Sequence, residues 1–416
     1  MLNSKETKVF MIGWEWPPFN SGGLGVACQG LAKALSMRVS KVVFTLPVKV
    51  ETTDNFVELC YPKKEEKISI YKFYSSFSAY SKVSVNCFEK SVKSGNSNPE
   101  KVNGLNLLNR VLAYADFVEN KCLDYDFDVI HAHDWLSFPA AAKAGKKSGK
   151  PFIAHVHATE FDRCAGDNVN REVYEIERKG LEEADGIIAI SRRIKNILIE
   201  KYGIDPEKIN LIHNGIDPDY FKKTNDLNFQ IEALKKNGNK VVLYVGRLTV
   251  QKGVEFLIRA AKDVVKHSNG KTYFVIVGSG ELRDQLAGYA AELGISDKVL
   301  FPGFLRGKEL AEVYRSADVL VMPSVSEPFG LIPLESLING TPVVVSKQSG
   351  VSEVLTNALK VDFWDVKELA NMILASLQYS SLNRYLKENG HKEVNGISWS
   401  TPAEKCLQYY QEFISK

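Results

Sequence analysis

The sequence predicts an α/β protein in which two doubly wound parallel sheets follow one another along the chain. The first observation is that short runs rich in valine and isoleucine alternate with helical patterns, which is typical of parallel sheets covered by helices on both faces. The second is that this alternation stops in the polar stretch 217–240 and then starts again. The third is length, since 416 residues suffice for two or three domains of ordinary size.

The first half contains five expected strands and two clear helical patterns. The strands are Val9–Ile12, Asp128–His131, Phe152–Val156, Gly186–Ile190 and Asn210–Ile212. Helices are expected near Leu24–Leu35 and Phe138–Lys146, after the first two of these strands. The stretch 52–106 is rich in Ser, Lys and Tyr, and we interpret it as an insertion with strands of its own.

The second half repeats the pattern. Its expected strands are Val241–Val245, Tyr273–Val277, Val299–Phe301, Val319–Met322 and Pro342–Val345. The polar stretch 217–240 between the halves carries Pro218 and ends in a Lys/Asn/Gly cluster, so it is expected to be a linker with a short helix.

Composition excludes several classes of protein. The 53 basic and 50 acidic residues leave a net charge of +3, and this balance does not indicate a nucleic-acid-binding protein. Local basic patches that contact a membrane surface stay open. None of the six cysteines forms a CxxC pair, and scattered thiols suit a reducing cytoplasm. No apolar run reaches the roughly 20 residues of a membrane span, and no signal peptide is recognisable. We therefore expect a cytoplasmic protein.

A glycine-rich segment follows the first strand. It runs from Trp14 to Gly25 and contains Gly22 and Gly23 just before the first helix. Adjacent glycines let a backbone approach a ligand closely, and a helix N-terminus offers N–H groups to an anion. The spacing is not GxGxxG, so an ordinary dinucleotide site is not favoured. A tight strand–helix turn is the structural alternative.

Two further segments with histidines follow neighbouring strands. The first is His131-Ala-His133-Asp134-Trp135, whose side chains could bind a polyol by hydrogen bonds and stacking. Histidines at i and i+2 share a strand face, but no third and fourth metal ligand is evident, and Asp134 could instead cap the next helix. The second segment contains His157, which could bond to a sugar or be structural.

Cations and carboxylates gather in the second half. Arg247 and Lys252 lie five residues apart in the loop GRLTVQKG, where both could bind one anion or simply be surface charges. Glu327 precedes a helix expected to begin near Gly330, and Glu335 lies inside that helix. Carboxylates accept hydrogen bonds from vicinal hydroxyls, so two of them could hold both ends of a nucleotide sugar. A two-carboxylate hydrolase is the rival, although it does not explain the anion-binding loops.

These segments resemble the retaining glycosyltransferases of GT-B fold, in the family-4 group with the glycogen synthases, and the resemblance covers nearly the whole chain. The stretch from Glu327 to Glu335 resembles the family's Glu-x7-Glu element, and GRLTVQKG resembles its phosphate-binding loop. HAHDW and VHATEFDR resemble stretches of glycogen synthases, the second containing their active-site histidine.

The resemblance implies two Rossmann-like domains facing across a cleft: 1–216 on the acceptor side, 217–395 binding the nucleotide sugar, and 396–416 a helix packing back on the first. It also implies roles. Arg247 and Lys252 hold the diphosphate without a metal, Glu327 holds the transferred sugar and Glu335 the ribose. The remaining implied contacts are Gly330 and Leu331 through backbone amides, Gly22 and Gly23 toward the diphosphate, Asp134 near the sugar, and His157 as the active-site histidine.

The implied reaction is transfer of a hexosyl unit, glucose in the first instance, from UDP- or ADP-glucose to an α-glucan. One departure puts ADP-glucose in doubt, because Asn20 stands where starch-type synthases carry a lysine before the glycine pair. The alternatives are mannosyl or glucosyl transfer in cell-envelope glycan, glycolipid or small-molecule synthesis, and, further off, a sugar epimerase or phosphorylase of the same fold or an inactive sugar-binding protein. Donor, acceptor, linkage and oligomeric state stay open from sequence.

Overall fold

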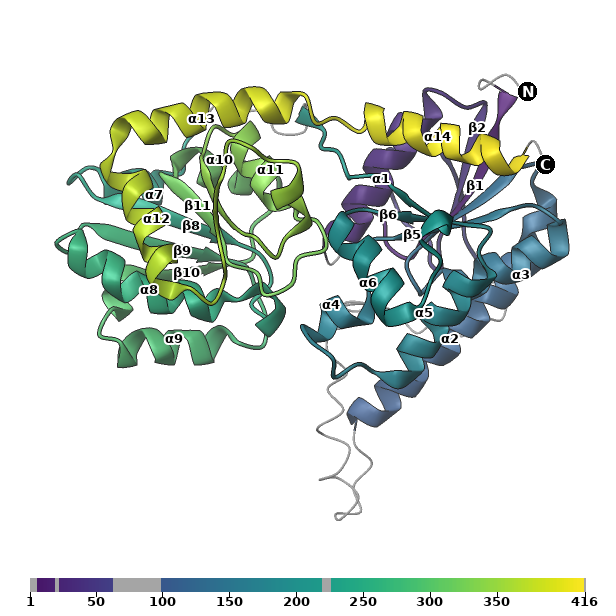
Figure 1. The fold of residues 1–416 in the computed structure, drawn as a ribbon, viewed down its shortest axis with the longest axis horizontal. Helices are drawn as coiled ribbons and strands as arrows, with labels where there is room; N and C mark the ends of the chain where they lie inside the picture. Colours follow the sequence, from purple (N-terminus) through teal and green to yellow (C-terminus); the bar gives the residue numbers. More distant parts are fainter. Residues whose placement is uncertain (1–5, 19–21, 63–98, 219–225, 415–416) are drawn as a thin grey trace, which may run out of the picture. The chain divides into compact units, whose positions relative to one another are not determined.

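The computed structural model describes residues 6–18, 22–62, 99–218 and 226–414 (Figure 1). The chain divides into two compact units: unit 1 comprises Met1–Gly215 with Trp399–Lys416, and unit 2 comprises Ile216–Ser398. Each unit contains one parallel sheet with helices packed on it, so the predicted α/β class with two sheets is confirmed. Within the described ranges, no helix is both long and apolar enough to cross a lipid bilayer.

Unit 1 is built on a seven-stranded sheet in the order β3-β2-β1-β4-β5-β6-β7, in which each neighbouring pair is parallel. The strands are β1 Lys8–Ile12, β2 Lys41–Thr45, β3 Glu58–Cys60, β4 Val129–His133, β5 Phe152–Val156, β6 Gly186–Ala189 and β7 Ile209–Leu211. All four residues of β6 and all five of β4 and β5 are buried. Burial on both faces explains why these strands are continuous apolar runs rather than alternating ones.

The helices of unit 1 are α1 Gly23–Ser36, α2 Pro99–Lys121, α3 Phe138–Ser148, α4 Glu160–Cys164, α5 Arg171–Glu183, α6 Arg192–Tyr202 and α14 Ser400–Ile414. Helix α14 comes from the C-terminal end of the chain and contacts α1. Both helices pack on one face of the sheet, where their buried side chains share a core with alternate strand residues such as Val129, Ile153 and Ile188. The C-terminal segment is therefore part of unit 1.

Unit 2 is built on a six-stranded parallel sheet in the order β10-β9-β8-β11-β12-β13. The strands are β8 Lys240–Val245, β9 Thr272–Val277, β10 Val299–Gly303, β11 Val319–Met322, β12 Val343–Ser346 and β13 Leu359–Val361. The helices are α7 Phe229–Lys235, α8 Val254–His267, α9 Arg283–Glu292, α10 Gly307–Ser316, α11 Leu331–Ile338, α12 Val366–Gln378 and α13 Ser380–Asn395. The first six strands of unit 1 have the same order. In both sheets the first three strands extend toward one edge and the next three toward the other, so the strand order reverses after the third strand.

Every strand predicted from sequence exists, but three strands were not predicted. Two of the five residues of β2 are polar, while β3 and β13 have only three residues each. The interpretation of 52–106 as an insertion with strands of its own is wrong for its described part. β3 pairs with β2 in the main sheet, and α2 begins at Pro99. The rest of that stretch, 63–98, lies outside the described residues.

The stretch 217–240 contains the predicted short helix, which is α7, and ends where β8 begins at Lys240. The side chain of Asn228 accepts a hydrogen bond from the N–H of Ile231, which caps the start of this helix. Residues 219–225 of the same stretch lie outside the described residues.

Close backbone approach shapes the loop that follows β8. Gly278 has φ +140°, and a Cβ built on it would lie 1.8 Å from the carbonyl oxygen of Gly246. Gly253 ends the same loop with φ +62°, and its Cβ would lie 2.1 Å from the carbonyl oxygen of Pro323. Since the contacts are with backbone atoms, no side-chain rotation could relieve them. The path of residues 246–253 therefore depends on glycine at these positions.

Gly278→Ala is expected to destabilise unit 2 by about 2–4 kcal/mol, because it combines a positive φ with a backbone clash. Gly288→Ala serves as the matched control: this glycine lies in α9, and a Cβ there meets no described atom within 4 Å. The control should be neutral or more stable by up to about 1 kcal/mol. Thermal denaturation followed by circular dichroism measures both, and equal midpoints would contradict the steric account.

Candidate functional site

The segments singled out in the sequence follow strands at, or next to, the points where each sheet reverses its order. In unit 1 the order reverses between β1 and β4, and in unit 2 between β8 and β11. Parallel strands end at one edge of a sheet, and ligands of doubly wound folds bind beyond that edge at the reversal. The loops after β8 and β11 therefore occupy the expected binding position of unit 2, and the segments after β1 and β4 that of unit 1.

Glu327 lies between β11 and α11 and is held through both its backbone and its side chain. Its N–H donates to the carbonyl of Gln348 at 3.2 Å, and its carbonyl accepts from the N–H of Gly350 at 3.0 Å. Its Oε2 accepts from Lys252 Nζ at 2.7 Å and from Ser324 Oγ at 3.3 Å. Only 8% of Glu327 is exposed, so the charges are weakly screened by solvent. The second oxygen, Oε1, has no partner among the described residues.

Arg247 and Lys252 lie on the loop after β8, which is bonded directly to the loop of Glu327. Arg247 Nη2 donates to Gln251 Oε1 at 3.2 Å. The backbone carbonyl of Gln251 accepts from the N–H groups of Val325 and Ser326 at 3.0 and 3.3 Å. The structure therefore brings Lys252 into contact with Glu327 and holds Arg247 on the same pair of loops.

Helix α11 begins next to this ion pair. Its N-cap residue is Gly330, with φ +102°, and no described side chain caps the helix. A Cβ at Gly330 would lie 3.1 Å from Glu327 Cγ, so glycine also allows the carboxylate to pack against the helix end. The first-turn N–H groups, including that of Leu331, carry the partial positive charge of the helix terminus. An anion could therefore bind beside Lys252 and Glu327.

Glu335 lies on the second turn of α11 and is partly exposed. Its Oε2 accepts a hydrogen bond at 2.8 Å from the hydroxyl of Tyr314, a fully buried residue of α10. Burial raises the pKa of Glu335, and the bond from Tyr314 acts in the opposite direction. One carboxylate oxygen is thus fixed by the protein while the group keeps a path to solvent.

Four histidines of unit 1 lie on one face of the sheet, at the ends of β4 and β5. Side chains alternate along a strand, so His131 and His133 share a face, as do His155 and His157. His131 Nε2 lies 2.9 Å from His155 Nδ1, and His133 Nδ1 lies 3.0 Å from His157 Nε2. The prediction that β4 ends at His131 is therefore wrong: the strand continues to His133, and both residues are buried within it.

The four imidazoles are neutral because they are buried. Burial, reinforced by neighbouring histidines, lowers the pKa of His131 to about 3 and lowers those of His133 and His155 well below the usual value. The pKa of His157 is also lowered by burial, with the charge of Asp134 opposing. His157 is 7% exposed, whereas the other three are at most 2% exposed. His157 is therefore the one best placed to meet a ligand, as a neutral donor or acceptor.

Asp134 positions the backbone that carries His157. Its Oδ1 accepts from the N–H groups of His157 and Ala158 at 2.6 and 3.2 Å, and its own φ is +60°. It does not cap the following helix, because α3 begins at Phe138 with Ser137 as its N-cap. The alternative that Asp134 is a helix cap is wrong.

A buried ion-pair network holds the segment that follows His157. Arg163 of α4 donates to Glu160 at 2.8 Å, to the carbonyl of Ala158 at 3.2 Å, and to Glu177 of α5. Tyr202 of α6 also donates to Glu177. Three helices are thus joined behind the loop, and removing either charge of the buried pair would leave the other uncompensated.

The glycine pair precedes the first helix as predicted. Gly22 is the N-cap of α1, its backbone is extended with φ −168°, and Gly23 is the first helical residue. A Cβ on Gly22 would meet no described atom within 4 Å. The packing of the described residues around this position therefore does not require glycine at position 22. Asn20, which raised the doubt about ADP-glucose, lies outside the described residues.

Several residues escaped the sequence analysis. In the site of unit 2 they are Gln251, Tyr314 and Ser324, and in unit 1 they are two buried neighbours of the histidines, Cys28 on α1 and Tyr410 on α14. Tyr410 hydrogen-bonds through its hydroxyl to His131 Nδ1. Gln251 and Ser324 lie in the same loops as their partners Arg247 and Glu327. Tyr314, Tyr410 and Cys28 instead meet partners on other elements, which no local pattern indicates.

Comparison with known proteins identifies the family. The family model described as Glycosyl transferases group 1 matches residues 226–393, and that described as Glycosyltransferase Family 4 matches 88–220. An uncharacterised glycosyltransferase of Methanocaldococcus jannaschii is 30% identical over 418 residues, covering 97% of this chain and 98% of the relative. The chain belongs to the family-4 glycosyltransferases of GT-B fold.

Other relatives of this transferase differ in their acceptors. A D-inositol 3-phosphate glycosyltransferase of Nocardia farcinica is 29% identical over 300 residues, covering 68% of this chain and 66% of the relative. A glycogen synthase of Mycobacterium tuberculosis is 30% identical over 291 residues, covering 68% of each. Family membership therefore does not by itself select an acceptor.

Solved structures agree on the fold. Sucrose-phosphate synthase of Thermosynechococcus elongatus matches with a TM-score of 0.76 at 20% identity, covering 99% of this chain and all of that one. Anabaena HepE in complex with UDP-glucose matches with a TM-score of 0.64 at 18% identity, covering 99% of this chain and all of that one.

The buried histidines predict acid sensitivity of the fold. Their folded pKa values lie below the unfolded value, so the stability they contribute is complete above pH 6.5 and is lost as pH falls toward about 3. Each histidine adds a slope of up to about 1.4 kcal/mol per pH unit. The free energy of unfolding, measured by urea denaturation with EDTA present, should be lower at about pH 5 than at about pH 7.

A comparison of two variants separates the contribution of the buried histidines to the pH dependence of folding stability from that of other groups. His131→Gln should flatten the slope by about one histidine's share, and His267→Gln, at an exposed position of α8, is the control for the substitution itself. Identical slopes in the two variants would contradict the assignment of buried neutral imidazoles.

Proposed function

We propose that this transferase moves a glucosyl unit from UDP-glucose or ADP-glucose to an α-glucan, with retention of anomeric configuration and without a metal. The observation that carries the proposal is the Lys252–Glu327 pair at the uncapped start of α11. A cation, a carboxylate and helix N–H groups at one place match a ligand that joins sugar hydroxyls to a diphosphate. The UDP-glucose complex of HepE, a protein of the same fold, supports this class of donor.

The charges of unit 2 suit the leaving group. As the sugar–phosphate bond breaks, negative charge grows on the diphosphate, and fixed cations stabilise it without reorganising. We assign this role to Arg247 and Lys252, together with the backbone N–H groups of Gly330 and Leu331. Each cation at about 4 Å contributes roughly 4 kcal/mol before desolvation, at an effective dielectric of about 20.

The two glutamates receive separate roles. Glu327 Oε1 accepts hydroxyls of the transferred sugar while Lys252 holds Oε2. Glu335 accepts the ribose hydroxyls, with Tyr314 fixing its other oxygen. We assign neither glutamate the role of a hydrolase-type acid or nucleophile.

The residues of unit 1 supply neutral polar contacts. His157 bonds to a hydroxyl of the transferred sugar, and Asp134 acts near that sugar chiefly by holding the His157 backbone. Gly22 and Gly23 allow their loop to approach the diphosphate. The glycogen synthase relative supports the glucan acceptor, and the inositol phosphate transferase supports the runner-up, a small phosphorylated polyol.

A donor and acceptor panel tests the proposal directly. Nucleotide release is measured with UDP-, ADP- and GDP-glucose and GDP-mannose, each with glycogen, maltooligosaccharides or inositol phosphate. We expect release from UDP- or ADP-glucose that depends on the glucan, and an α-linked product by NMR. Release only with inositol phosphate would favour the runner-up, and a β-linked product would reject retention.

Variants of the two glutamates separate their roles. Glu327→Gln should lower kcat by about 10²–10³, the usual effect of losing one preorganised transition-state contact. Glu335→Gln should mainly raise the KM for the donor, because the ribose does not react. Glu388→Gln on the exposed surface of α13 is the control. Wild-type kcat in Glu327→Gln, with an unchanged circular dichroism spectrum, would reject its assigned role.

A further inference from the structure

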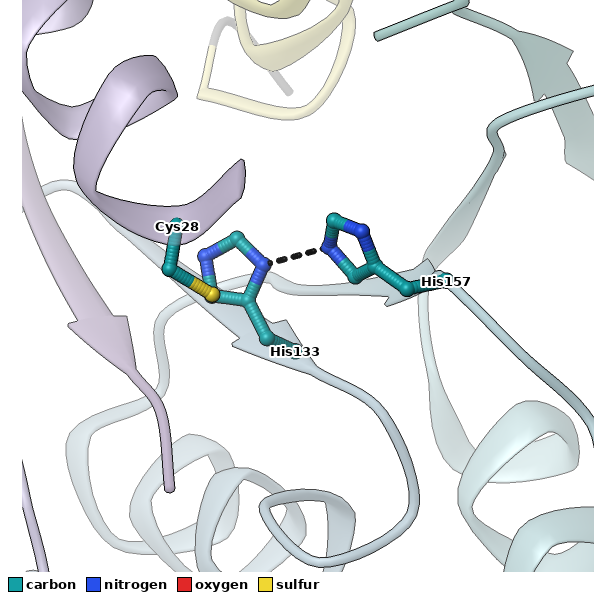
Figure 2. A group of neighbouring side chains, drawn as sticks. All are labelled: Cys28, His133 and His157. Carbon is teal, nitrogen blue, oxygen red and sulfur yellow. Dashed lines mark hydrogen bonds between the residues drawn. The ribbon is translucent and has the colours of Figure 1, made fainter. Parts of the chain in front are cut away.

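Cys28, His133 and His157 meet in the interior of unit 1 from three separate elements. Cys28 comes from α1, His133 from the end of β4, and His157 from the residue after β5 (Figure 2). Each offers one ligand atom, and these atoms all lie within 4.8 Å of one another. All three side chains are buried, with 0%, 0% and 7% exposed.

We propose that these three side chains form a site for one borderline or soft metal ion such as Zn²⁺, and that its occupation inhibits the transferase. The inhibition rests on the proposed function, because it requires His157 to contact the transferred sugar. Binding rests on the geometry alone.

The donor set selects the kind of metal. One sulfur and two imidazole nitrogens match Zn²⁺, Cd²⁺ and Co²⁺ rather than Mg²⁺ or Ca²⁺, which take oxygen ligands. Both imidazoles are neutral through burial, so each keeps one N–H. One of the two bonded nitrogens carries the proton of the His133–His157 hydrogen bond, and that ring must move its proton to its other nitrogen before both lone pairs can face the ion. The Cys28 thiol is protonated, since burial, Asp134 and Glu15 raise its pKa. Binding therefore forms the metal–sulfur bond and releases the thiol proton to solvent.

The distances require only small movements. With metal–nitrogen bonds of about 2.0–2.1 Å and a metal–sulfur bond of about 2.3 Å, tetrahedral ligand atoms lie roughly 3.3–3.6 Å apart. His133 Nδ1 and His157 Nε2 are already 3.0 Å apart, and from the 4.8 Å limit the sulfur would have to approach by at most about 1.2–1.5 Å. Three protein ligands leave the fourth position open, as in exchangeable sites.

The other nitrogen of the His133 ring can take up the ring proton. His133 Nε2 is buried and has no hydrogen-bond partner in the described part of the chain, an arrangement that ordinarily costs free energy. Behind it, the His131 ring stacks on His133 with centroids 4.5 Å apart and is itself held by Tyr410. The ring of His133 is thus fixed, and its Nε2 is free to carry the proton when Nδ1 binds the ion.

A second trio, His131, His133 and His155, is also close enough to hold an ion. We favour the trio with Cys28, because His157 is the most exposed of the four histidines and offers a route of entry. Asp134 also places negative charge near both Cys28 and His157, which partly balances the ion.

Cobalt titration of the metal-free protein tests the site without any activity. Co²⁺ should produce the thiolate-to-cobalt charge-transfer band in the near ultraviolet and the intense visible bands of tetrahedral cobalt. Cys28→Ala should lose the charge-transfer band and weaken binding at least roughly 100-fold, since even outer partners of metal ligands contribute about 10–100-fold. Cys406→Ala removes another buried thiol of the same core and should change neither the charge-transfer band nor the affinity for Co²⁺.

Transfer assays test the inhibition. Zn²⁺ should inhibit the wild-type enzyme and the Cys406→Ala variant, and EDTA should reverse this. Cys28→Ala should keep its basal turnover and need at least roughly 100-fold more Zn²⁺. No charge-transfer band in the wild type, or a band that survives in Cys28→Ala, would overturn the site.

Full turnover with the site loaded by Zn²⁺ would overturn the inhibition. A wild-type protein that is inactive with every donor would reject the proposed function, and the cobalt spectrum would still decide the site.

Discussion

Parallel strand pairing is the constraint on which the rest of this structure depends. A parallel sheet sends every strand end to one edge, and the reversal after the third strand leaves space there for the loops of two neighbouring strands. Residues separated by 75 positions, Lys252 and Glu327, can then form one ion pair. In unit 1 the same pairing aligns His133 with His155, 22 positions apart in the chain.

The strands and the chemistry of their ends could largely be predicted because both leave local signals. Runs such as Val319–Met322 are apolar throughout, and the glycines and prolines after them mark the loops. The glycosyltransferase family followed from motifs within single loops, above all Glu327 to Glu335. Very short strands such as Leu359–Val361 give too few residues for a period to be recognised, and they exist because the neighbouring strand completes their hydrogen bonds.

Contacts between elements distant in sequence could not be predicted from patterns. Cys28 shows in sequence only as an apolar position of an amphipathic helix, and nothing local places its thiol beside His133. The second partner of His131 is Tyr410, 279 residues further along the chain. The bonds of Asp134 to the His157 and Ala158 backbone likewise depend on the pairing of β4 with β5, so its alternative as a helix cap was equally reasonable from sequence.

The candidate sites of the two units differ in charge. Unit 2 presents fixed cations and helix N–H groups, which would suit the departing diphosphate of the proposed reaction. Unit 1 presents imidazoles that burial keeps neutral, so they can bond to hydroxyls without competing for the diphosphate. That neutrality has a second consequence, since an uncharged imidazole beside a thiol is also a metal ligand. The property that suits His157 to a sugar would therefore also make it vulnerable to zinc.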